Sequence, residues 1–166
     1  IEEIFDSLEG ATIFSTLDLF SGYHQILMDE ESINLTGFTT KFGNFVYKVM
    51  PFGLIGAPAT YQREMNRILF ELIGKSVYIF LDDILVFSKN KEEHIEHLKE
   101  VLEIFRKHKV KLNIEKCKFF KEEVEILGQR VTNKGLTTVE AVKNWTKPSN
   151  IWKFVLSWAQ LDTTVY

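Results

Sequence analysis

Residues 76–88 read SVYIFLDDILVFS, two apolar runs separated by the adjacent aspartates Asp82 and Asp83. Runs this rich in β-branched and aromatic residues predict two buried strands joined by a tight turn. A carboxylate that is buried without a partner is costly, so the pair must lie at an exposed turn or be held by cations. Paired aspartates are also common in ordinary hairpin turns, and alone they do not establish catalysis.

Asp18 stands in another apolar run, residues 12–20 (TIFSTLDLF), which predicts a further strand. If this strand lies beside the 76–88 hairpin, Asp18 and Asp82 meet at one end of the sheet. Carboxylates gathered in this way suit Mg²⁺, which binds one or two of them together with phosphate oxygens and water. Two such ions about 3.5–4 Å apart activate an attacking hydroxyl and stabilise a leaving oxygen. The pattern therefore indicates phosphoryl or nucleotidyl transfer.

The rest of the chain predicts a mixture of helices and strands. The predicted helices cover residues 1–9, 59–73 and 91–109, and the further strands cover residues 36–41, 44–50 and 123–133, the last as a hairpin. The order β, ββ, α, ββ, α, ββ lacks strict βαβ alternation. The sequence therefore predicts an α+β fold with a mostly antiparallel sheet.

The composition is that of an ordinary globular domain, with 166 residues of which 45% are hydrophobic and 26% charged. No apolar run approaches the roughly 18 residues of a membrane span, and no signal peptide is visible. The one cysteine, Cys117, excludes an internal disulfide. We therefore expect an intracellular protein of the cytoplasm or nucleus, not secreted and without a membrane partner.

The formal net charge of −3 is unusual for a nucleic-acid binder. Six lysines lie between residues 107 and 121, where they would form either a local basic face or a solvated helix end. The predicted helix 91–109 is expected to face the core with the stripe Ile95, Leu98, Leu102 and Phe105. His94 and His97 lack the ligand set of a zinc site, and we interpret both as solvated helix surface.

Five segments in succession resemble the motifs of Ty3/Gypsy-type reverse transcriptases. They are residues 14–26 (FSTLDLFSGYHQI, motif A), 50–62 (MPFGLIGAPATYQ, motif B), 80–83 (FLDD, motif C), 112–119 (LNIEKCKF, motif D) and 124–128 (VEILG, motif E). The resemblance extends from the first residue to about residue 148. Five ordered motifs make it far more specific than FLDD alone.

The resemblance implies a polymerase palm, a ferredoxin-like antiparallel sheet with helices packed on one face, acting as an RNA-directed DNA polymerase. In it, Asp18, Asp82 and Asp83 are catalytic and hold Mg²⁺, or Mn²⁺ in its place, for two-metal transfer of dNMP onto a primer 3′-OH. Lys116 matches the motif D lysine that assists the pyrophosphate leaving group. The implied partners are an RNA or DNA template with its primer, and dNTPs.

The resemblance also implies a nucleotide pocket. Tyr23 matches the family's steric gate, whose ring lies under the sugar and clashes with a ribose 2′-OH. The other implied contacts are the main chain of Leu19 and Phe20 with the triphosphate, Phe52 and Gly53 with the dNTP, and Leu127 and Gly128 with the primer backbone.

The sequence departs from the family pattern in motif B, where Ile55-Gly56 replaces a polar pair usually ending in Asn. We expect residues 1–148 to form the palm, with most of the fingers absent. Residues 149–166 match the family only faintly, and we expect either the start of a thumb or connection or a decayed end. The fingers, thumb and RNase H parts would belong to a larger polyprotein.

Two other interpretations remain open at this stage. The first is a catalytically lapsed or domesticated palm that acts as a nucleic-acid-binding or protein-interaction module. The acidic pI of about 5.9 favours it, and the intact aspartates disfavour it. The second is another palm enzyme, such as a nucleotidyl cyclase, which shares the carboxylates but has no need of motifs B and E.

Overall fold

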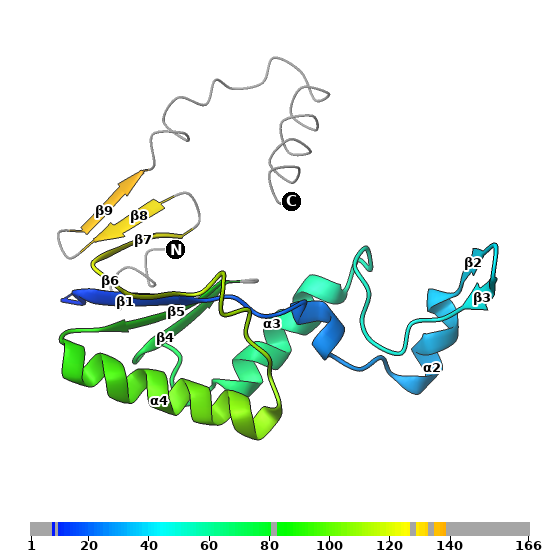
Figure 1. Ribbon diagram of the computed structural model, residues 1–166, viewed down its shortest axis with the longest axis horizontal. Coiled ribbons are helices and arrows are strands. Elements are labelled where there is room, and N and C mark those ends of the chain that lie inside the picture. The colour runs from blue at the N-terminus through cyan, green and yellow to red at the C-terminus, as the bar shows by residue number, and fades with distance from the viewer. Residues whose placement is uncertain (1–7, 9, 81–82, 127–128, 133–134, 139–166) are drawn as a thin grey trace, which may run out of the picture.

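The computed structural model describes residues 8, 10–80, 83–126, 129–132 and 135–138 (Figure 1). Its strands are β1 (Ile13–Leu17), β2 (Phe38–Thr40), β3 (Gly43–Phe45), β4 (Val77–Phe80), β5 (Asp83–Ser88), β6 (Lys118–Lys121), β7 (Glu123–Ile126), β8 (Gln129–Thr132) and β9 (Gly135–Thr138). Its α-helices are α2 (Glu30–Ile33), α3 (Ala57–Ile68) and α4 (Lys91–His108), and its 3-10 helices are η1 (Gly22–Gln25) and η2 (Asn34–Thr36).

The central sheet has the order β4-β5-β1-β6 and is antiparallel between each pair of neighbours. One face packs on α3 and α4, with Leu17, Ile84 and Val86 in the same cluster as helix residues. The other face carries Phe14 and Leu85 and is covered by the β7-β8-β9 sheet. Figure 1 shows the two helices on one side of the sheet and β7–β9 on the other. Because both faces of β5 are covered, its sequence is a continuous apolar run rather than an alternating one.

Helix α4 has well-defined ends. The Asn90 side chain accepts a hydrogen bond from the Glu93 amide at 2.9 Å, which caps the N-terminus. Acidic residues lie in the first turn and basic residues in the last, as the helix dipole favours. Lys109 adopts the left-handed conformation, with φ of 58°, and ends the helix. Within the described part of the chain, no helix is both long enough and apolar enough to cross a membrane.

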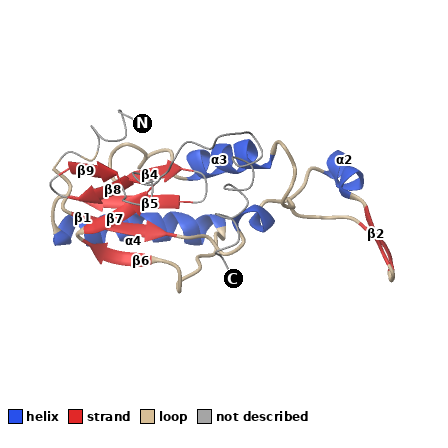
Figure 2. Ribbon diagram, turned by 90° about the horizontal axis from the view of Figure 1, so that it is seen from above, coloured by secondary structure: helices blue, strands red, loops and turns tan. Residues whose placement is uncertain are grey.

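An arm formed by α2, η2 and the β2–β3 hairpin extends away from the sheet, as Figures 1 and 2 both show. Its base is closed by two backbone hydrogen bonds, from Met28 N to Lys48 O (3.0 Å) and from Met50 N to Ile26 O (2.9 Å). At its far end the hairpin places aromatic rings in contact, with Phe38 stacked on Phe45.

The predicted α+β fold, with an antiparallel sheet and helices on one face, is confirmed. Several boundaries differ from the sequence prediction. Strand β1 ends at Leu17, so Asp18 follows the strand instead of lying within it. Helix α3 begins at Ala57, because Pro58 is compatible with a first helical turn, and it ends at Ile68. Of the predicted strand 44–50, only residues 44 and 45 belong to a strand, as part of β3. The predicted helix over residues 1–9 lies outside the described residues, apart from Leu8.

The predicted core-facing stripe of α4 is confirmed at Leu98 and Phe105 and was wrong at Ile95 and Leu102, which are 39% and 42% exposed. The positions one residue earlier, His94 and Val101, are buried instead. The sequence interpretation took the most apolar positions as the core face. The helix instead turns a histidine inward, because two serines of the sheet, Ser15 and Ser88, are buried beneath it.

His94 is therefore a buried core residue and not solvated surface. Its Nε2 is hydrogen-bonded to Ser15 Oγ at 2.7 Å and its Nδ1 to Ser88 Oγ at 2.8 Å. Ser15 Oγ also accepts from the Phe120 amide, and Ser88 Oγ is bonded to His97 Nδ1. This network ties α4 to β1, β5 and β6. Burial, with a smaller contribution from nearby His97, lowers the pKa of His94 to about 4.

We predict that this histidine makes stability depend on pH. In the unfolded chain His94 has its usual pKa near 6.5, whereas the folded chain keeps it neutral down to about pH 4. Between pH 6.5 and 4 the folded state thus binds fewer protons than the unfolded state. The contribution of His94 to the free energy of unfolding is therefore fully present above pH 6.5 and is lost as the pH falls toward 4. Between pH 7 and 5 the loss should be about 2 kcal/mol in the free energy of unfolding. Urea unfolding across this range measures it.

The matched variants are His94→Gln and His108→Gln, the latter at the exposed end of α4. His94→Gln should be less stable at pH 7 and show a flatter pH dependence, because it has no imidazole to protonate. His108→Gln should keep the wild-type slope. Parallel curves for wild type and His94→Gln would contradict the assignment.

Candidate active site

Two of the three predicted catalytic carboxylates come to the same end of the central sheet. Strands β1 and β5 are antiparallel, with Leu17 opposite Ile84. Carried one position further, this register sets Asp18, which directly follows β1, level with Asp83, the first residue of β5. Asp83 is exposed and Asp18 is half-buried, so both lie within reach of solvent.

The third predicted carboxylate, Asp82, lies outside the described residues. It belongs to the two-residue connection between Phe80 and Asp83, which pair at the ends of β4 and β5. The predicted primer-grip residues Leu127 and Gly128 also lie outside the described residues, in the connection between β7 and β8.

The backbone around Asp18 is fixed by the segment that follows α4. The Asp18 amide donates to Cys117 Sγ at 3.4 Å, and its carbonyl accepts from the Asn113 amide at 2.9 Å. Two residues later, the Phe20 amide donates to the Lys111 carbonyl at 3.0 Å. These bonds hold the main chain at the end of β1 while the Asp18 carboxylate remains partly exposed.

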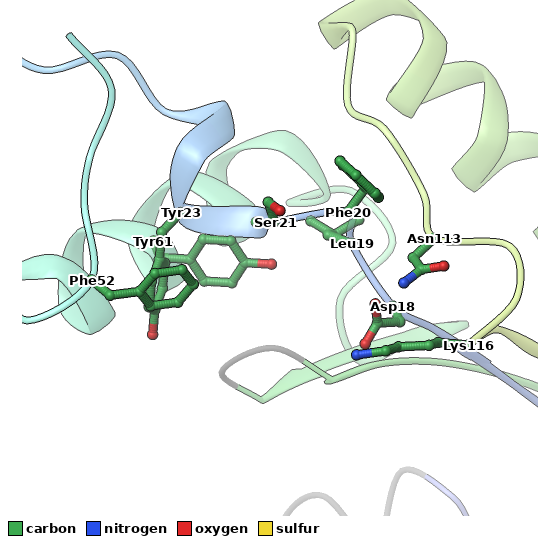
Figure 3. A pocket seen from close by; sticks show the side chains of 10 residues that line it. Asp18, Leu19, Phe20, Ser21, Tyr23, Phe52, Tyr61, Asn113 and Lys116 are labelled. Atoms are coloured by element: carbon green, nitrogen blue, oxygen red, sulfur yellow. The ribbon is translucent and has the colours of Figure 1, made fainter. Parts of the chain in front are cut away.

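A cavity of about 310 Å³ opens beside Asp18 (Figure 3). It is lined by Asp18, Leu19, Phe20, Ser21, Gly22, Tyr23, Phe52, Tyr61, Asn113 and Lys116. Of the predicted substrate residues, Leu19, Phe20, Tyr23 and Phe52 are thus brought together with one carboxylate and with Lys116. Gly53 is not among the lining residues. Its φ of +89° favours glycine and shapes the loop that carries Phe52.

Three aromatic rings form the end of the cavity farther from Asp18, as Figure 3 shows. The centroid of the Tyr23 ring lies 5.1 Å from that of Phe52 and 5.2 Å from that of Tyr61, which it meets edge-on. Tyr61 is only 1% exposed, and a Cβ on Gly22 would lie 2.9 Å from its ring. Glycine is therefore required where the turn passes the Tyr61 ring. Nothing in the sequence predicts the contact of Tyr61 with Tyr23, because the two residues belong to different motifs.

Lys116 projects from an exposed turn between α4 and β6, closed by its amide donating to the Asn113 carbonyl at 3.1 Å. Its side chain lines the same cavity as Asp18, and Figure 3 shows both residues at the end of the cavity away from the three aromatic rings. This end therefore carries charges of both signs. Lys116 could contact an anionic group there, and the carboxylates could bind a cation.

The donors at this end of the sheet fit a hard divalent cation. Asp18 and Asp83 supply carboxylate oxygens, the ligand type that Mg²⁺ prefers, in a place where a hydrated ion can reach them. Among the described residues, no three His, Cys, Asp or Glu side chains gather as a complete metal site. Asp82, which the sequence predicts as a further ligand, is not among those residues.

Comparison with known proteins identifies the family of the chain. A family model described as "Reverse transcriptase (RNA-dependent DNA polymerase)" matches residues 2–131. The Retrovirus-related Pol polyprotein from transposon 297 of Drosophila melanogaster is 45% identical over 136 residues, which are 82% of this chain and 13% of that protein. The corresponding polyprotein from transposon gypsy is 36% identical over 157 residues, 92% of this chain and 15% of that protein. The Transposon Tf2-3 polyprotein of Schizosaccharomyces pombe is 36% identical over 154 residues, 90% of this chain and 12% of that protein.

Solved structures with a similar fold include the foamy viral protease-reverse transcriptase in complex with RNA/DNA hybrid. It has a TM-score of 0.76 at 24% sequence identity, covering 88% of this chain and 20% of that one. The same viral protein with double-stranded DNA has a TM-score of 0.77, also at 24% identity, over 87% of this chain and 26% of that one. These likenesses support the fold, while the polyprotein relatives, of which this chain spans 12–15%, support the family. The chain therefore belongs to the reverse transcriptase (RNA-dependent DNA polymerase) family, among relatives that are Ty3/gypsy-type transposon polyproteins.

Proposed function

We propose that this chain is the catalytic palm of an RNA-directed DNA polymerase, which adds dNMP to a primer 3′-OH by two-metal nucleotidyl transfer. The observation that carries the proposal is the β1–β5 register, which sets Asp18 level with Asp83 at the edge of a cavity lined by Tyr23 and Lys116. Family membership supports the reaction class. The alternative of a lapsed palm gains no support from this arrangement, because two carboxylates level with each other at the ends of apolar strands contribute nothing to the core.

In this proposal Asp18, Asp82 and Asp83 hold Mg²⁺, with Mn²⁺ as an alternative ion. When bound, the ions activate the primer hydroxyl and neutralise charge on the phosphates. The protein's part is to fix the carboxylates. Asp18 is placed by the backbone bonds to Cys117 and Asn113, and Asp83 by its position as the first residue of a paired strand.

The nucleotide lies in the cavity beside Asp18. Tyr23 faces the sugar as the steric gate, with Phe52 and Tyr61 supporting its ring from two sides. The triphosphate lies along the turn that Leu19 and Phe20 begin. The Phe20 amide already donates to Lys111, so the amides that follow it, those of Ser21 and Gly22, are the proposed donors to the phosphates.

On the opposite wall, Lys116 stabilises the negative charge that develops on the pyrophosphate and donates a proton to it as it leaves. Its exposed amino group is free to follow the leaving group. Gly53 keeps the Phe52 loop close to the nucleotide, and Leu127 and Gly128 press on the primer backbone.

The partners in this proposal are an RNA or DNA template with its primer, and dNTPs. The foamy viral protein of similar fold was solved with an RNA/DNA hybrid, which supports a primer–template on the palm. We further propose that residues 1–148 form the palm and that residues 149–166 lead toward a thumb or connection. Fingers, thumb and RNase H would come from the longer polyprotein, since the chain spans 12–15% of its relatives.

The proposal predicts that Asp18→Asn lowers the rate of nucleotide addition at least about 100-fold, because an amide cannot balance the charge at the site. Single-turnover primer extension with Mg²⁺, by the polymerase that contains this chain, measures the rate. Asp29→Asn is the matched control, because the Asp29 side chain makes no capping hydrogen bond to α2 and is not among the residues that line the cavity. Equal rates for Asp18→Asn and the control would remove the catalytic assignment.

A second prediction concerns sugar choice. Tyr23→Ala should lower the ratio of kcat/KM for dNTP over rNTP, because it removes a clash with the 2′-OH more than it removes a contact with dNTP. Tyr23→Phe keeps the ring and should keep the ratio near wild type. Competing dNTP and rNTP incorporation opposite one template base measures both. A ratio unchanged in Tyr23→Ala would assign the ring to packing alone.

A further inference from the structure

We propose that Gln25 is a positioning residue for the nucleotide, because its side-chain amide locks together the two walls of the cavity. The inference rests on the proposed function, since it concerns the same site. One wall is the turn from Asp18 to Tyr23, and the other is formed by Asn113 and Lys116, which belong to the segment that begins at Lys111. These walls are about ninety residues apart in sequence and belong to different motifs.

Gln25 bridges the walls with three hydrogen bonds. Its Nε2 donates to the Phe20 carbonyl at 2.7 Å and to the Lys111 carbonyl at 2.9 Å. Its Oε1 accepts from the Lys111 amide at 2.7 Å. Both amide hydrogens and the carbonyl oxygen are thus used, which no side chain with donors alone or acceptors alone can reproduce.

The bridge begins where the backbone pairing between the walls stops. The main chain pairs through Asn113 N to Asp18 O and through Phe20 N to Lys111 O. After Phe20 the chain turns away into η1. Gln25 lies at the end of η1, and its side chain makes two further hydrogen bonds to the main chain of Lys111. The side chain thus takes the place that the backbone of a paired strand would have.

The turn that follows Phe20 adopts a strained backbone conformation and needs the restraint that Gln25 supplies. Ser21 has φ of 48° and ψ of 56°, a left-handed conformation that non-glycine residues seldom adopt. The hydrogen bond from Gln25 Nε2 to the Phe20 carbonyl joins the two ends of the turn, and Tyr23 lies between these ends in the sequence. The position of the Tyr23 ring over the nucleotide therefore depends on Gln25 as well as on Phe52 and Tyr61.

The consequence is kinetic. Displacement of a binding group by about 1 Å can cost on the order of 100-fold in rate, so a clamp that fixes both walls contributes to kcat/KM for the nucleotide without touching it. Gln25→Glu keeps the shape but turns a carboxylate toward two carbonyl oxygens. Gln25→Met keeps the length and removes all three bonds. If the hydrogen bonds of Gln25 position the nucleotide, both variants should show the same loss of kcat/KM.

The test is single-nucleotide incorporation by the polymerase that contains this chain, on a defined primer–template. For Gln25→Glu and Gln25→Met we expect kcat/KM for dNTP to fall about 10–100-fold, mainly through KM. The dissociation constant for primer–template should stay within about twofold, and the preference for dNTP over rNTP should weaken as Tyr23 loses its fixed position. Asn44→Asp makes the same amide-to-carboxylate change on the exposed β2–β3 hairpin and should match wild type.

A merely structural role would give a different result. It would lower the melting temperature and the active fraction, and would leave the KM for dNTP and the sugar preference of the active molecules unchanged. That outcome, or wild-type kinetics in both variants, would overturn the proposal.

Amide hydrogen exchange in this chain gives a readout that does not depend on turnover. The Lys111 amide, which donates to Gln25 Oε1, should exchange at least about tenfold faster in Gln25→Met. Unchanged exchange would show that Gln25 does not couple the two walls. A wild-type enzyme that extends no primer would overturn the proposed function instead, and the exchange result would still decide on the clamp.

Discussion

The antiparallel pairing of β1 with β5 is the constraint on which the rest of the structure depends. Both strands are covered on two faces, by α3 and α4 on one side and by β7 and β8 on the other. A shift by one residue would exchange the side chains of the two layers and separate the buried Ser15 and Ser88 from His94, so these polar contacts help to specify the register. The same register sets Asp18 level with Asp83. The packing of the core thus fixes the relative position of two carboxylates that are not themselves part of that core.

Much of this fold could be predicted from sequence, because the strongest signals are local. The apolar runs around Asp82 and Asp83 gave β4 and β5, and the periodicity of residues 91–108 gave α4. The missed features depend on partners distant in sequence. Strand β6 (KFFK) is short and mixed and is a strand because β1 offers it an edge. The face of α4 was misplaced because His94 becomes an inward residue only when Ser15 and Ser88 meet it.

In the candidate site, too, the residues in motifs were predicted, and their distant partners were not. Asp18, Tyr23 and Phe52 were predicted as members of motifs, and the structure gathers them beside one cavity. The residues that hold them there were not predicted. Cys117 bonds the Asp18 amide across 99 residues and Gln25 reaches Lys111 across 86. In a single sequence a cysteine and a glutamine of this kind look like ordinary half-buried residues. Their role is visible only once the turn after β1 and the segment after α4 are seen paired.

The ends of doubly covered strands are a favourable place for this chemistry. A carboxylate in the middle of β1 or β5 would be buried and would require neutralisation. At Asp18, one residue beyond the end of β1, the backbone is still held by its neighbours, while the side chain is only half-buried and lines the same cavity as Lys116. Rigidity and access are therefore obtained at adjacent positions of one strand. The net charge of −3 does not oppose the proposed function, because a phosphate at this site would experience the local charges and amides and not the sum over the chain.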